Sequence, residues 1–223
     1  MRSIITGGLG YIGSNLKELL EDPIIYDLKN GDDIRDWPAL NEALADVGIC
    51  YHLAAWSGIQ LCEKDPRAAF EMNVNGTLNV MLVCNRFDIP VVFASSQAAK
   101  NPINVYGLTK RLAEDIVRFY GGIVVRIANV YGGKRYTELK NSAVARLMTG
   151  TWEERGHGAE KRDFIHVEQV CEKLVEASSR FIKEHLPSKS IIDARTGKML
   201  SIDELVALSR KPDFPMNIQG ARA

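Results

Sequence analysis

The fold class is decided by the stretch Ser3-Ile4-Ile5-Thr6-Gly7-Gly8-Leu9-Gly10-Tyr11-Ile12-Gly13. Its first four residues predict a short buried strand, and glycines at positions 7, 10 and 13 follow the strand directly and open a helix. Glycines at this spacing allow a tight turn, a close approach of the backbone to phosphate, and close packing of helix on strand. The helix N-terminus offers free N–H groups to a pyrophosphate. The stretch therefore predicts a dinucleotide-binding unit.

An acidic residue at the end of the next strand strengthens this prediction. Asp27 follows Gly7 by 20 residues, where a carboxylate can accept hydrogen bonds from an adenosine ribose. A carboxylate there repels a 2′-phosphate, so NAD is favoured over NADP, although Lys29 nearby could soften the preference. The alternative is that Asp27 only caps a turn. Downstream, Asp33 and Ile34 could lie beside an adenine or belong to a solvated acidic turn.

The chain alternates short apolar runs with amphipathic stretches. Each run is too short for a helix, and continuous apolar strands joined by helices predict a parallel sheet covered on both faces. The expected fold is therefore a doubly wound α/β layer. The predicted strands are residues 3–6, 24–26, 49–53, 91–94, 123–126 and 191–192. After Tyr131 the alternation loosens into a loop-rich region with a helical pattern near residues 141–148, and Ser201 with Glu204 predicts a later helix N-terminus.

Composition excludes several classes of partner. The 223 residues hold 28 Lys+Arg and 28 Asp+Glu, so the net charge is 0 and no basic field attracts nucleic acid. No apolar run approaches the roughly 20 residues that span a bilayer, and the start of the chain lacks a signal-peptide pattern, so a cytoplasmic protein without a membrane partner is expected. The four cysteines form no CxxC pair and the four histidines no metal-binding motif, so no metal is expected.

The candidate reacting groups are a phenol and an ammonium one helical turn apart. Tyr106 and Lys110 share a helix face, and a nearby cation can lower the pKa of a phenol so that it removes a hydroxyl proton. Tyr136 and Lys140 have the same spacing. Context favours the first pair, because the preceding strand ends in Ser96, at the sheet edge where ligands bind. Ser96 has a second reading as a turn cap.

Several motifs, in this order along the chain, resemble the extended short-chain dehydrogenase/reductases, and more narrowly the NAD-dependent nucleotide-sugar epimerase/dehydratase family with its 4-epimerase-like members. The resemblance runs from residue 2 to about Leu205. The motifs are Thr6 to Gly13, Asp33-Ile34-Arg35-Asp36, His52-Leu53-Ala54-Ala55, Asn73-Val74-Asn75-Gly76-Thr77, Phe93-Ala94-Ser95-Ser96, Tyr106 to Lys110, Arg126-Ile127-Ala128-Asn129-Val130-Tyr131-Gly132 and Arg162-Asp163-Phe164-Ile165-His166-Val167.

The resemblance implies a Rossmann fold, a set of site residues and a homodimer formed through helices near residues 68–87 and 108–119. The catalytic residues would be Ser96, Tyr106 and Lys110. A nucleotide-sugar would contact Ser96, Tyr106, Asn129 and Arg162. The arginine suits a diphosphate because its planar guanidinium can bond two oxygens at once. The alternative is that Arg162 only pairs with Asp163. NAD would contact Gly7, Gly10, Tyr11, Ile12, Asp27, Asp33, Ile34, Leu53, Ala54, Ala55, Asn73, Lys110 and Ala128.

The sequence departs from the family in its substrate-binding parts. Only nine residues separate Ser96 from Tyr106, the stretch from Tyr131 to Arg162 is compact, and the chain stops soon after Leu205. We therefore expect an NAD-binding core at residues 1–130, completed by residues 162–195. Residues 131–161 and 196–223 would form a small, shortened substrate-binding region.

The residues after Ser96 favour one reaction of the family. Dehydratases of the family have an acidic pair there, whereas this chain has Gln97-Ala98 and so lacks an acid to protonate a leaving hydroxide. Asp27 argues against the NADP-dependent reductases. The predicted function is epimerisation at C4 of a nucleotide-linked hexose, most simply a UDP-hexose. The alternatives are another NAD-dependent reaction of a nucleotide-sugar, such as dehydration or oxidation, and a non-catalytic NAD-binding module.

Overall fold

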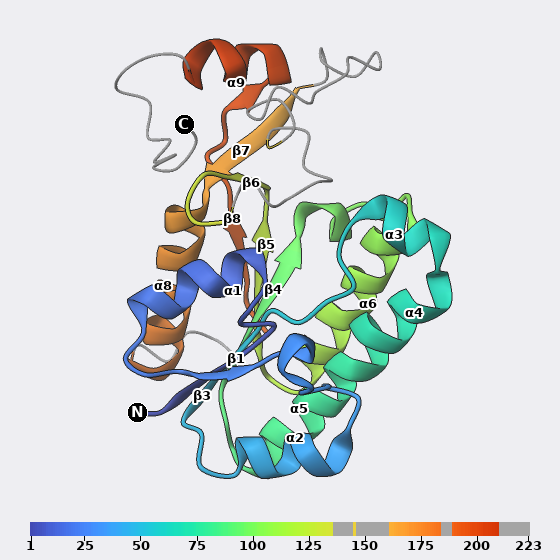
Figure 1. The fold of residues 1–223 in the computed structure, drawn as a ribbon, viewed down its shortest axis with the longest axis vertical. Helices are drawn as coiled ribbons and strands as arrows, with labels where there is room; N and C mark the ends of the chain where they lie inside the picture. The colour runs from blue at the N-terminus through green and yellow to red at the C-terminus, as the bar shows by residue number, and fades with distance from the viewer. Residues whose placement is uncertain (136–144, 146–160, 184–188, 210–223) are drawn as a thin grey trace.

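The computed structural model describes residues 1–135, 145, 161–183 and 189–209 of the chain (Figure 1). Most of these residues belong to a Rossmann-type layer. A smaller group of elements lies beyond one edge of that layer, at the top of Figure 1. The helix predicted near residues 141–148 falls in a stretch of which only Ala145 is described, and the Tyr136 and Lys140 pair lies outside the described residues.

A six-stranded sheet forms the centre of the molecule. All its neighbouring strands are parallel, and their order is β2-β1-β3-β4-β5-β8. The strands are β1 (Ser3–Thr6), β2 (Ile24–Tyr26), β3 (Ile49–His52), β4 (Val91–Ser96), β5 (Ile123–Ile127) and β8 (Ile191–Ala194). The chain passes from β1 to β2 on one side and then returns to β3 on the other. Ligands of open α/β sheets bind at such a reversal, at the carboxyl ends of the strands.

Helices cover both faces of the sheet, as continuous apolar strands require. Figure 1 shows α1 (Tyr11–Leu16) and α8 (Val167–Lys183) on one face. The other face carries α2 (Trp37–Leu44), α3 (Ile59–Lys64), α4 (Pro66–Phe70), α5 (Gly76–Arg86) and α6 (Val105–Phe119). Two separate apolar cores result, one around Phe93 and Leu40, the other around Ile5 and Leu174, all four fully buried. The predicted doubly wound fold is confirmed.

A second, small sheet was not predicted from the sequence. It pairs β6 (Asn129–Tyr131) with β7 (Arg162–His166) in parallel, and β7 with β9 (Met199–Leu200) in antiparallel. These strands lie in the loop-rich part of the chain, outside the regular alternation of apolar runs and helices that identified the strands of the main sheet. The helix α9 (Ile202–Ser209) follows, and its predicted capping box is confirmed: Glu204 N–H donates to Ser201 Oγ at 3.0 Å, and Ser201 N–H donates to Glu204 Oε2 at 2.7 Å.

Among the described residues, no helix combines the length and the apolar character that a bilayer crossing requires. The same residues contain no group of three or more His, Cys, Asp or Glu side chains placed to hold a metal ion.

Candidate active site

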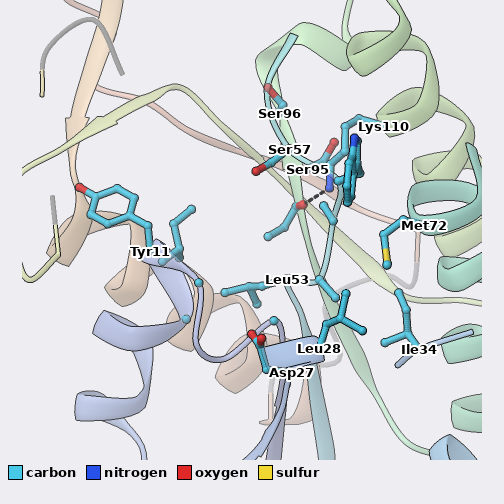
Figure 2. A pocket seen from close by; sticks show the side chains of 18 of the residues that line it. Tyr11, Asp27, Leu28, Ile34, Leu53, Ser57, Met72, Ser95, Ser96 and Lys110 are labelled. Carbon is cyan, nitrogen blue, oxygen red and sulfur yellow. Dashed lines mark hydrogen bonds between the residues drawn. The ribbon is translucent and has the colours of Figure 1, made fainter. Parts of the chain in front are cut away.

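A cavity of about 560 Å³ opens at the carboxyl ends of β1, β3 and β4. Most of the residues predicted from the sequence line it together. In Figure 2, Asp27 lies at one end, and Ser96 and Lys110 lie at the other. The predicted residues that line the cavity are Gly7, Gly10, Tyr11, Ile12, Asp27, Asp33, Ile34, Leu53, Ala54, Ala55, Ser96, Tyr106, Lys110 and Ala128.

Close backbone contacts require glycine at two positions, Gly7 in the loop after β1 and Gly13 in α1. Gly7 has φ +71°, and a Cβ on it would lie 2.7 Å from the Ala54 nitrogen. A Cβ on Gly13 would lie 2.5 Å from the Gly7 carbonyl oxygen. Any side chain at these positions would displace main chain rather than a flexible neighbour. The loop therefore keeps a bare backbone surface at the cavity, as a bound pyrophosphate requires.

Asp27 has both of the roles considered from the sequence. Its Oδ1 accepts from the Lys29 N–H at 2.9 Å, which caps the turn after β2, and its Oδ2 accepts from the Leu9 N–H at 2.9 Å. The side chain also lines the cavity while being only 8% exposed. Two backbone donors thus fix the carboxylate beside the glycine loop, where it can receive ribose hydroxyls. Lys29 Nζ donates to the Leu9 carbonyl at 3.3 Å instead of pairing with Asp27.

The segment after β2 completes this end of the cavity. Ile34 is buried, and its Cδ1 would be 2.5 Å from a Cβ on Gly76, so α5 packs directly on it. Asp33 lines the cavity and forms a bidentate ion pair with Arg35, whose guanidinium lowers the pKa of the Asp33 carboxyl. The acidic turn is thus folded against the cavity and not free in solvent.

The reacting groups meet at the opposite end. The Asn104 side chain caps α6 by accepting from the Gly107 N–H at 2.8 Å, which places Tyr106 in the first helical turn and Lys110 in the second. Ser96 ends β4, and its hydroxyl lies near enough to Tyr106 to lower the pKa of the phenol. Its Oγ also accepts from the Ala98 N–H at 3.2 Å, so the capping role considered for it is present as well. Serine, phenol and ammonium therefore form one constellation.

The protein alone does not produce the lowered Tyr106 pKa expected from the sequence. Burial raises the pKa of Tyr106, and the Ser96 hydroxyl offsets this only in part. The Lys110 ammonium donates to the Ala94 carbonyl at 2.7 Å (Figure 2). It also lies 4.2 Å from the centre of the Phe93 ring. Burial lowers the pKa of Lys110 to about 7. Desolvation thus outweighs the influence of the Ser96 hydroxyl on Tyr106, and it outweighs the attraction of Glu114 for the Lys110 ammonium.

Three predicted contact residues lie outside the cavity lining. Asn73 is buried behind it, where its amide accepts from the Trp56 N–H at 2.7 Å and donates to the Trp56 carbonyl and to Thr109 Oγ1. Through these hydrogen bonds the Asn73 side chain fixes the backbone of Trp56 in the cavity wall. Asn129 and Arg162 begin the neighbouring strands β6 and β7, and Asn129 Nδ2 donates to the Asp163 carbonyl at 3.1 Å. The Asp163 carboxylate accepts from the turn at Thr196 and Gly197.

Sequence reasoning missed several residues of the cavity wall. Trp56, Ser57, Met72 and Val130 line the cavity. The buried Trp56 Nε1–H has no partner among the described residues. Trp56 and Ser57 directly follow the predicted strand-end residues Ala54-Ala55, so the rule that ligands bind at strand ends would have found them. Bare glycine backbone, a fixed carboxylate and a buried donor together fit a dinucleotide.

The fold and the cavity define a dinucleotide-dependent α/β enzyme whose cavity brings Ser96, Tyr106 and Lys110 together. The chain belongs to the NAD dependent epimerase/dehydratase family, whose model matches residues 3–185. It is 26% identical over 275 residues to a UDP-glucose 4-epimerase of Rhizobium meliloti (strain 1021), covering 96% of this chain and 83% of the relative.

Solved structures confirm the fold. A UDP-glucose 4-epimerase from Brucella ovis in complex with NAD matches with a TM-score of 0.81 and 24% identity, over 93% of this chain and 81% of that one. A dTDP-glucose 4,6-dehydratase from Streptomyces venezuelae, with NAD bound, matches with a TM-score of 0.78 and 23% identity, over 93% and 80% of the two chains. The family is therefore established, whereas both an epimerase and a dehydratase share the fold.

Proposed function

We propose that the protein is an NAD-dependent enzyme that epimerises a nucleotide-linked hexose at C4. The observation that carries the proposal is the convergence of Ser96, Tyr106 and Lys110 at one end of a dinucleotide cavity whose other end holds Asp27. Bound NAD would supply an acceptor that takes a hydride from the sugar and returns it. Asp27 supports NAD over NADP, because its buried carboxylate repels a 2′-phosphate.

The chain's own residues divide the remaining work. Tyr106 takes the proton of the 4-hydroxyl and later returns it to the oxygen of the 4-keto sugar. Ser96, whose hydroxyl lies near Tyr106, orients that oxygen by a hydrogen bond. Lys110 holds positive charge at the base of the site and stabilises the phenolate form of Tyr106. Arg162 and Asn129 would contact the diphosphate and the sugar from β7 and β6.

The distribution of acids supports epimerisation over dehydration. The carboxylates that line the described cavity are Asp27, Asp32 and Asp33, and all three belong to the segment after β2. Gln97 follows Ser96, and its Nε2 donates to the Arg126 carbonyl at 3.1 Å and to Asp193 Oδ1 at 2.8 Å. An amide engaged in this way cannot protonate a leaving hydroxide, so elimination of water lacks an acid at the reacting end.

A UDP-hexose is the substrate we propose. The relative from Rhizobium meliloti, which this chain resembles over 96% of its length, is a UDP-glucose 4-epimerase. The alternative enzyme reading is an NAD-dependent dehydratase or dehydrogenase of a related nucleotide-sugar, supported by the shared family. The alternative outside catalysis is an NAD-binding module, against which the assembled reacting groups argue.

Product analysis tests the proposal directly. The protein is incubated with catalytic NAD and a panel of UDP-, dTDP- and GDP-hexoses, and the products are identified by NMR and mass spectrometry. A product of unchanged mass, inverted at C4 and formed without net NADH, is the expected result. Loss of water would establish a dehydratase, and accumulating NADH a dehydrogenase. Tight NAD binding without conversion of any sugar would favour the binding module.

We also propose a homodimer formed through α5, α6 and their neighbour α4. The described surface of α6 exposes Leu108, Leu112 and Phe119, the last at 76%, and Phe70 of α4 is exposed at 37%. Apolar side chains gathered on neighbouring helices favour burial against a second copy. Light scattering at micromolar concentration should give the mass of a dimer, and Leu112→Glu should shift it towards the monomer. A monomeric wild type would refute the proposal.

A cytoplasmic location is proposed on the state of the thiols. All four cysteines are free and buried, so the fold needs no oxidising compartment. A fluorescent fusion should show diffuse cytoplasmic signal, and export of the protein would contradict it.

A further inference from the structure

A buried carboxylate next to the reacting groups has no role in the function described so far. Glu114 follows Lys110 by one helical turn on α6, and its side chain is only 1% exposed. Burying a charged carboxylate is costly unless ionic and hydrogen-bonding partners compensate. The partners of Glu114 therefore indicate what the charge is retained for.

Glu114 is held from two strands of the sheet. Arg126 of β5 donates through Nε to Oε1 at 2.9 Å and through Nη2 to Oε2 at 2.7 Å. Ser95 of β4 donates its hydroxyl to Oε1 at 2.5 Å. Ser95 and Arg126 are register partners in the parallel pair of β4 and β5, so the carboxylate ties α6 to both strands at one level.

That level is the reacting end of the cavity. Ser95 stands between Ala94, whose carbonyl accepts from Lys110, and Ser96, whose hydroxyl is near enough to Tyr106 to lower its pKa. A shift of α6 along β4 would therefore lengthen both of these contacts together. Glu114 anchors the helix one turn beyond Lys110, so its hydrogen bonds oppose such a shift.

We propose, on the basis of the catalytic roles assigned above, that Glu114 is a positioning residue of the active site: through Ser95 and Arg126 it fixes α6 against β4, and its buried charge balances the Lys110 ammonium. Lys110 interacts electrostatically with Glu114 of α6, Cys62 of α3 and His52 of β3, and Arg126 of β5 pairs with the same Glu114. His52 is buried between the Thr6 and Thr77 hydroxyls, and its pKa is lowered to about 3, so it is neutral at physiological pH. Glu114 is then the charged group that stabilises the ammonium.

The ionisation of Lys110 agrees with this assignment. Burial lowers the pKa of Lys110, and Glu114 is the largest influence that raises it again. Without the carboxylate, Lys110 would lose its proton at still lower pH. The phenolate of Tyr106 would then lack a cation at the pH where the enzyme works.

A titration of Lys110 itself tests the proposal without any sugar substrate. Lysines are labelled with 13C at Cε, the Lys110 signal is assigned by its loss in Lys110→Arg, and its NMR midpoint is measured against pH. Glu114→Gln keeps one acceptor oxygen for Ser95 and the Arg126 Nε but replaces the other with an amide donor and removes the charge. It should lower the midpoint by about 1 to 3 pH units. Glu114→Asp should restore most of it.

The matched control is Asp115→Asn, which removes a carboxylate from the neighbouring position of α6. Asp115 is 54% exposed and pairs with Arg111 and Arg118, so the Lys110 midpoint should stay where it is in the wild type. A folded Glu114→Gln protein with an unchanged midpoint would overturn the proposal. The Lys110 midpoint is measured without turnover. It therefore tests the role of Glu114 even if the protein proves not to be an epimerase.

A second variant covers the case in which Glu114→Gln does not fold. Ser95→Ala removes one small hydroxyl of the tie and leaves both charges in place. With a substrate identified as above, it should lower kcat several-fold while leaving NAD affinity unchanged, and the alkaline limb of its pH profile should stay in place. An unchanged kcat would contradict the positioning role.

Discussion

Burial acts in opposite directions on the two reacting residues of α6. It raises the pKa of Tyr106 and lowers that of Lys110 to about 7, so the protein alone favours a neutral phenol. A cation brought into the cavity would favour the phenolate of Tyr106 and would further disfavour the Lys110 ammonium. Proton transfer at Tyr106 is thus coupled to what the cavity binds, and single substitutions here should act on turnover more than on the fold.

Tyr106→Phe is the most direct of these substitutions. It removes the proton acceptor but keeps the ring that fills the wall of the cavity. We expect turnover to fall by about 10²- to 10⁴-fold, the range found for lost acid-base catalysis, with NAD affinity unchanged. Steady-state kinetics and NAD titration of the same preparation check this. A variant that kept most of its turnover would show that another group takes the proton.

Asp27→Asn should change the choice of cofactor. The two backbone donors from Leu9 and Lys29 hold the carboxylate against the cavity, so its charge acts on whatever lies at the ribose. Removing that charge should narrow the NAD over NADP preference by about 10-fold or more. Dissociation constants of both cofactors, measured by calorimetry, test this. Asp46→Asn, at an exposed position after α2, should leave the ratio of the NAD and NADP dissociation constants unchanged. A wild-type protein that prefers NADP would contradict the prediction.

At the scale of an element, α6 carries two different faces. Tyr106, Lys110 and Glu114 repeat every fourth residue on the face towards the sheet, whereas Asp115 pairs with Arg111 and Arg118 on the solvent side. Four-residue steps nearly match a helical turn, so the reacting groups stay in one row along the helix axis. Their height above β4 depends on where the helix starts, which the Asn104 cap determines.

Asn104→Ala should therefore affect both stability and turnover. Loss of a side-chain cap costs about 1 kcal/mol of the free energy of unfolding. The first turn of α6 contains Tyr106, so kcat should fall as well. Asp65→Ala is the matched control, since Asp65 caps α4 by accepting from the Ala68 N–H at 2.9 Å, away from the cavity lining. It should lose similar stability in chemical denaturation and keep its kcat. Equal kcat in both variants would refute the link.

At the scale of the whole molecule, the sequence predicts the layer better than its additions. Strands such as Val91–Ser96 are buried on both faces, so they appear in the sequence as continuous apolar runs. These runs, together with the glycine loop after β1, allow the fold to be predicted from local sequence patterns. The short strands β6, β7 and β9 depend on pairing between distant segments, which no local pattern shows. Asn73 was predicted to contact NAD, yet it bonds Trp56 and Thr109, a distinction that only three-dimensional packing makes.

Burial of Lys110 lowers the free energy of unfolding of the protein at neutral and acidic pH. The pKa of Lys110 is about 7 in the native state, against about 10.4 in an unfolded chain. Between these values the unfolded state binds more protons, so this residue makes the free energy of unfolding rise with pH, and below pH 7 its full penalty remains. Lys110→Met removes the ammonium but keeps the length of the side chain.

The variant should therefore gain stability over the wild type at pH 6, and the gain should shrink towards pH 9 while turnover is lost at both. The Ala94 carbonyl loses its donor, which lowers the stability of the variant equally at every pH. Urea denaturation of both proteins at pH 6, 7.5 and 9 gives the difference between their free energies of unfolding. Contributions from other titrating groups cancel in this difference. Lys100→Met, at an exposed position, should show no such trend. A difference independent of pH would mean that Lys110 keeps its ordinary protonation when buried, and that its charge carries no cost to the fold.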